Sequence, residues 1–98
     1  MEPRTTHTAK WSHEIDRIDD FLLHLLLRRL FYARLMGESK REKGEEIEDA
    51  DRETYILRRL SYSCPQLSYS DVEMLWEHVF RLSKREQLRA YSSSNANV

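Results

Sequence analysis

An arginine, Arg29, interrupts an otherwise apolar helical face in the first third of this chain. Leu22, Leu25 and Leu26 precede it at steps of three and four residues, and Ala33 continues the same face. A guanidinium remains charged at neutral pH, and burying it without a counter-charge is costly. An arginine at this position therefore predicts that the folded protein offers it an anion.

A second cation, Lys40, follows Arg29 by eleven residues. At about 100° per residue this is three turns plus about 20°, so both side chains point the same way, about 16 Å apart along the axis. Lys40 also lies in a run of charged residues, 40–43, of the kind that usually faces solvent. Spacing alone leaves both interpretations of Lys40 open.

Two later helical patterns also place polar residues on apolar faces. In the second pattern, Arg52 and Glu53 share a side with Ile56. In the third, Ser83 and Gln87 continue an apolar face by one and two further turns. Three segments that each bring polar groups to an apolar interior predict a buried polar pocket.

Each polar residue also has an ordinary structural alternative. Asp49 precedes a helical pattern and fits an N-cap. Arg52 and Glu53 could form an ion pair, and Ser83 could bond to its own backbone. The pocket is favoured because all the alternatives would have to hold at once.

Composition indicates one small all-helical domain. The chain has 98 residues, with only two glycines and two prolines, and no β-hairpin signal. A net charge of −1 gives no sign of nucleic-acid binding, and no apolar run is long enough to span a membrane. The single Cys64 excludes an internal disulfide, and without a signal-peptide pattern a cytoplasmic protein is expected.

Capping signals divide the chain into three expected helices. They run from Ser12, as N-cap, to Lys43; from Asp49, as N-cap, to Tyr62; and from a capping box at Ser70 to Tyr91. We therefore expect a flexible segment over 1–10, a helical domain over 11–91 and a disordered tail over 92–98.

The expected helix lengths conflict with a monomer. A first helix of roughly 30 residues would be about 45 Å long, against about 20 to 35 Å for its partners. Half of its apolar face would then have nothing to pack on. We expect a homodimer in which the two long helices lie side by side and roughly antiparallel.

The order of these residues resembles that of the all-helical (AroQ-class) chorismate mutases. The resemblance covers residues 11–88 and rests on motifs that follow one another with the family's spacing. These are 15–19 (Ile-Asp-Arg-Ile-Asp), Leu22, Leu23, Leu25, Leu26, Arg29, Ala33, Gly37, Lys40, 49–53 (Asp-Ala-Asp-Arg-Glu), Ser83 and Gln87.

The resemblance implies an intertwined dimer of three-helix protomers that rearranges chorismate to prephenate. The step is pericyclic, with no metal, cofactor or covalent intermediate, and the substrate is a dicarboxylate. Lys40 and Gln87 would donate to its ether oxygen, where negative charge grows. Arg29 would bind a carboxylate and complete the catalytic set. The other implied substrate contacts are Asp49 and Glu53 at the ring hydroxyl, and Arg52 and Ser83 at the carboxylates.

One position departs from the family pattern. Members usually carry an arginine near the start of the first helix that reaches into the partner's site, and Ser12 stands there in this chain. Two alternatives follow: a non-catalytic or degenerate helical dimer that binds a metabolite or partner, and an isochorismate pyruvate lyase or a mutase of an aminated analogue. The lyases tend to lack the groups corresponding to Glu53 and Ser83, so these two residues favour the mutase.

Overall fold

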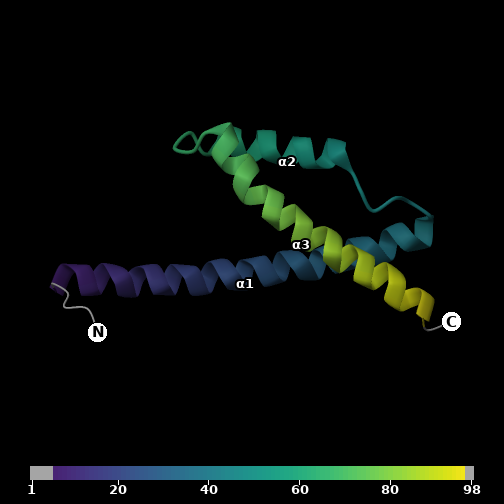
Figure 1. Ribbon diagram of the computed structural model, residues 1–98, viewed down its shortest axis with the longest axis horizontal. Coiled ribbons are helices and arrows are strands. Elements are labelled where there is room, and N and C mark those ends of the chain that lie inside the picture. The colour runs from purple at the N-terminus through teal and green to yellow at the C-terminus, as the bar shows by residue number, and fades with distance from the viewer. Residues whose placement is uncertain (1–5, 97–98) are drawn as a thin grey trace.

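The computed structural model describes residues 6–96, with side chains described over residues 7–92. Within this range the chain forms three helices and no strand: α1 (Thr6–Lys43), α2 (Ala50–Ser63) and α3 (Tyr69–Ala96) (Figure 1). The expected all-α, three-helix class is confirmed. The long N-terminal helix is also confirmed, and the molecule extends over 59 × 32 × 16 Å.

Helix α1 begins earlier than the sequence analysis predicted. Ser12 lies inside the helix and is not its N-cap, and residues 6–10 are helical rather than flexible; residues 1–5 lie outside the described part. No glycine or proline in residues 6–12 stops the helix, and the rings of His7 and Trp11 stack at 5.7 Å across one turn. The other end is as predicted, at Lys43, with Gly44 at φ 68°.

The predicted cap of α2 is confirmed, whereas the cap of α3 lies at a different residue from the one predicted. Asp49 Oδ1 accepts a hydrogen bond from the Arg52 backbone N–H at 3.0 Å, so Asp49 is the N-cap of α2. The capping box of α3 lies at Ser68 and Asp71, two residues before the predicted Ser70. Each of these side chains accepts from the other's backbone N–H at 3.1 Å. Ser70 has an acidic residue at the same spacing, Glu73, so spacing alone does not distinguish the two serines.

The predicted disordered tail over 92–98 is wrong for residues 92–96. Helix α3 continues to Ala96, five residues past the expected end at Tyr91, and residues 97–98 lie outside the described part. These residues are small and polar but include no glycine or proline, so adding turns to an existing helix costs little.

Helix α3 crosses α1 and also packs against α2, while α1 and α2 make no direct helix–helix contact (Figure 1). Gly37 marks the crossing: a Cβ atom there would lie 2.6 Å from the Gln87 carbonyl oxygen. Ala33, one turn earlier, is buried against the same neighbour helix. Small residues on α1 therefore allow the backbone of α3 to approach closely.

The buried core of the single chain is small and is divided between the α1–α3 crossing and the contact of α2 with α3. Its apolar members are Ala33, Ile56, Leu57, Val72 and Ala90. The apolar face predicted for the first half of α1 is present but uncovered. Its side chains are more than half exposed: Ile15 57%, Ile18 54%, Leu22 59% and Leu25 56%. Within residues 6–96, no helix combines the length and the apolar character needed to cross a membrane.

Candidate active site

A cavity of about 330 Å³ lies where α1, α3 and the start of α2 meet. The volume is within the range of small-molecule pockets. All seven predicted site residues line it, although they come from three helices: Arg29, Lys40, Asp49, Arg52, Glu53, Ser83 and Gln87. Ser12 lies on α1 well away from this cavity and is not part of its lining.

Arg29 is half-buried in the wall made by α1 and α3. Its Nη1 donates to Ser83 Oγ, which in turn donates to the Val79 carbonyl at 2.8 Å, and its guanidinium lies 5.9 Å from the Phe80 ring centroid. Burial, and then the charge of Arg52, lower the pKa of Arg29 below its usual value. No carboxylate of the described residues pairs with it. Arg29 therefore has a hydrogen bond and an aromatic neighbour but no counter-charge. An anion bound in the cavity would compensate its positive charge.

Lys40 is buried, so the alternative of a solvated lysine is wrong. Its Nζ donates to the Ile47 carbonyl at 2.9 Å, in the loop that joins α1 to α2. An ammonium has three donors, and no partner for the other two is found among the described residues. Lys40 is therefore held in place by the backbone with donors left for a ligand.

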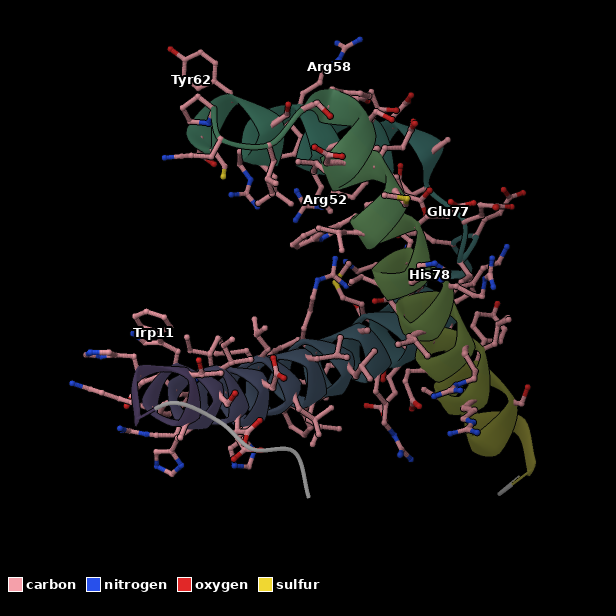
Figure 2. All side chains as sticks on the ribbon, turned by 60° about the vertical axis from the view of Figure 1, so that its left-hand side comes forward. Trp11, Arg52, Arg58, Tyr62, Glu77 and His78 are labelled. Atoms are coloured by element: carbon pink, nitrogen blue, oxygen red, sulfur yellow. The ribbon has the colours of Figure 1, made fainter. Side chains whose placement is uncertain are left out.

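Helix α2 brings a third cation and a carboxylate to the same cavity. Arg52 is exposed, lies 5.4 Å from the Tyr55 ring centroid, and projects on the side of α2 that faces α1 (Figure 2). Glu53 is half-buried beside it. Among the described side chains these two form no ion pair with each other, so that alternative is not supported.

Gln87 lies one turn beyond Ser83 on α3. Its Oε1 is buried and has no hydrogen-bond partner within the part of the chain that the structure describes. A buried amide left unsatisfied is unusual in a folded protein. A half-turn of the amide exchanges its oxygen and nitrogen, so Gln87 can offer a ligand either an acceptor or a donor.

The sequence analysis missed two charged residues of the lining. Lys84 on α3 pairs with Glu48 in the α1–α2 loop, with Nζ and Oε1 3.1 Å apart. Each neighbours a predicted site residue, Ser83 and Asp49, and that adjacency was the only available signal. Apolar lining residues that were also not predicted as site residues are Tyr32, Ala33, Met36, Ile47, Ile56 and Phe80.

The arrangement has the charges and the apolar walls to bind a small dianion. In the described part of the chain, no group of three or more His, Cys, Asp or Glu side chains is placed to hold a metal ion. Cations from two faces of the cavity, Arg29 and Lys40 on α1 and Arg52 on α2, surround a space with apolar walls. Such fixed cations stabilise an anion, or a transition state with growing negative charge, more strongly than mobile water does.

Comparison with known proteins identifies the family. No curated protein and no solved structure is similar enough to this chain to add to the comparison. The sequence pattern of chorismate mutase type II matches residues 11–88, which include α2, most of α1 and all seven predicted site residues. The all-helical fold agrees with this family. The chain therefore belongs to the type II, or AroQ-class, chorismate mutases, and is an isomerase of aromatic amino-acid biosynthesis.

Proposed function

We propose that this protein converts chorismate to prephenate in the cavity between its three helices. One observation supports this above all: seven residues matched to the family motif lie far apart in sequence, yet all line a single cavity. Three are cations, two are carboxylic acids and two are neutral polar groups, which suits a substrate with two carboxylates, a ring hydroxyl and an ether oxygen.

The proposed role of each residue is the one that the family resemblance implies, and the hydrogen bonds of each group support it. Arg29 and Arg52 bind the two carboxylates and hold the enolpyruvyl arm over the ring, which removes much of the entropic cost of reaching the reactive conformation. Lys40 and Gln87 stabilise the charge that grows on the ether oxygen as its bond breaks. Lys40 has two ammonium donors with no partner among the described residues, and the Oε1 atom of Gln87 has none.

The remaining polar groups orient the substrate. Glu53 accepts a hydrogen bond from the ring hydroxyl, near the backbone of Asp49 at the start of α2. Ser83 assists one carboxylate while it keeps Arg29 in position. No side chain is needed as a nucleophile or as a proton carrier, because the rearrangement transfers no proton.

A second copy of the chain is part of this proposal. The first half of α1 carries an apolar face that nothing covers, with side chains such as Leu22 and Leu25 more than half exposed. Exposed apolar surface of this extent is typical of an interface. A homodimer with antiparallel α1 helices would bury it and would bring the start of the partner's α1 towards the open side of the cavity.

The direct test is turnover of chorismate, followed by its ultraviolet absorbance and by identification of prephenate as the product. Isochorismate and an aminated analogue serve as competing substrates in parallel assays. We expect the greatest kcat/KM for chorismate, and release of pyruvate from isochorismate would instead indicate the lyase.

A bicyclic dicarboxylate that mimics the transition state supplies a second measurement. We expect it to bind much more tightly than chorismate, as transition-state mimics do. A folded dimer that neither consumes chorismate nor binds this mimic would contradict the proposal and would favour the non-catalytic alternative supported by Ser12.

A further inference from the structure

The loop that joins α1 to α2 positions residues of the site on both helices. Helices α1 and α2 do not contact each other, so the cations on α1 and those on α2 are related only through α3 and through residues 44–49. This loop provides the Ile47 carbonyl that holds Lys40 Nζ, and the Asp49 cap that begins α2. Any movement of the loop would therefore change the position of Lys40 relative to Arg52.

One side-chain contact in the described structure ties this loop to α3. Lys84 Nζ lies 3.1 Å from Glu48 Oε1, and the two residues are 36 positions apart in sequence. Glu48 lies between Ile47 and Asp49, the two loop residues that hold Lys40 and cap α2. On α3, Lys84 follows Ser83, whose hydroxyl accepts from Arg29. Adjacent residues of α3 thus position Arg29 and the loop.

We infer that Glu48 and Lys84 are a positioning pair, which keeps the 44–49 loop over the cavity so that Lys40 is aimed at the reacting bond. This inference rests on the proposed mutase function. Both side chains are partly exposed, 46% for Lys84 and 71% for Glu48, so the pair is open to solvent and to salt. An exposed pair contributes at most about fivefold to an equilibrium, and the expected effect is of that size.

The competing explanation is that Lys84 itself binds a substrate carboxylate, because it lines the cavity as a fourth cation. Neutralising Glu48 separates the two explanations. If the lining acts only through its net charge, Glu48→Gln should improve binding of a dianion. If the pair positions the loop, Glu48→Gln should be as harmful as Lys84→Gln.

The experiment compares kcat and KM for chorismate in Lys84→Gln, Glu48→Gln and the exchanged double variant Lys84→Glu with Glu48→Lys. We expect each single variant to lower kcat about fivefold with KM nearly unchanged, since Lys40 acts in the transition state. The exchanged pair keeps the charge of the lining and should restore kcat to within about twofold. High salt should reduce wild-type kcat towards that of the single variants.

The control is Arg89→Gln, which removes the pair of Arg89 and Glu86, 3.2 Å apart on the same helix but outside the cavity. It should leave kcat and KM unchanged. A raised KM in Lys84→Gln with no rescue by the exchanged pair, or wild-type kcat in Glu48→Gln, would overturn the inference.

Hydrogen exchange provides a readout that does not depend on turnover. The amide N–H of Glu45 donates to the Lys40 carbonyl at 2.8 Å, and that of Arg52 to Asp49. Both should exchange faster in Lys84→Gln and return to wild-type rates in the exchanged pair. If wild-type protein fails to convert chorismate, the proposed function fails, and these rates alone decide whether the pair holds the loop.

Discussion

The two halves of α1 differ in the size of the apolar side chains they carry and in what covers those side chains. Around Arg29 to Lys40 the helix packs against α3, its small residues are buried, and its cations line the cavity. Before residue 28 the same helix carries larger apolar side chains, yet Ile15, Ile18 and Leu22 are more than half exposed. The half with the weaker apolar face is the half that the chain itself covers.

This contrast shows how one helix can serve two purposes. The second half accepts small residues, and therefore little apolar burial, because α3 must approach closely enough to place Ser83 and Gln87 beside Arg29 and Lys40. The first half holds the large side chains, whose burial against a partner would contribute most to stability. Changes to each half should accordingly affect different properties.

The largest effect is expected from a charge on the uncovered half. Leu22→Asp removes a leucine worth about 2 kcal/mol of burial from each of two chains, so the dimer should weaken by about 4 kcal/mol, or about a thousandfold in dissociation constant. Sedimentation velocity across a concentration series measures this. His24→Asp places the same side chain about 200° around the helix and is the matched control. Equal dimer affinity in the two variants would contradict the predicted role of this face.

The next largest effect is expected from the cation at the other end of the helix. Lys40→Ala should raise the activation barrier by roughly 3 kcal/mol, a loss of about a hundredfold or more in kcat, because a pre-aimed donor is removed from the growing charge. Steady-state kinetics on the folded protein measures it. Lys43→Ala, in the same charged run but exposed, should leave kcat unchanged. Wild-type turnover by Lys40→Ala would refute the assignment.

The smallest effect concerns the packing of the second half of α1 against α3. Gly37→Ala gains about 1 kcal/mol of helix propensity but sets a methyl group 2.6 Å from a backbone carbonyl of α3, which cannot move aside as a side chain can. We expect a net loss of about 1 to 2 kcal/mol in the free energy of unfolding, measured with urea. Ser39→Ala in the same helix is the control, and a more stable Gly37→Ala protein would show that α3 can shift away.

Sequence patterns predicted the elements better than their ends. The three helices, the end of α1 at Gly44 and the Asp49 cap are as expected, because these depend on local backbone bonds. The start of α1 and the end of α3 were placed too far inward. A polar segment without glycine or proline can either continue a helix or lie outside it, so polarity alone does not mark a helix boundary.

Some residues of the candidate site could likewise be predicted from the sequence, and others could not. The seven polar residues on apolar faces were identifiable because each breaks a helical period, and the family's order of motifs reinforced them. Lys84 and Glu48 break no period, since both belong to ordinary charged surroundings. Their pairing depends on how α3 crosses the loop, which no local pattern records.

What the sequence by itself determined is which residues are helical and which side of each helix carries charge among apolar neighbours, because both follow from the fixed 100° turn per residue. The tertiary structure decided which of those faces meet. The close approach of α3 at Gly37 allows Arg29 to donate a hydrogen bond to Ser83. The carbonyl of Ile47 accepts a hydrogen bond from the buried Lys40. Contacts between residues so far apart in sequence depend on the crossing of whole helices, and that crossing is set by the fit of their surfaces.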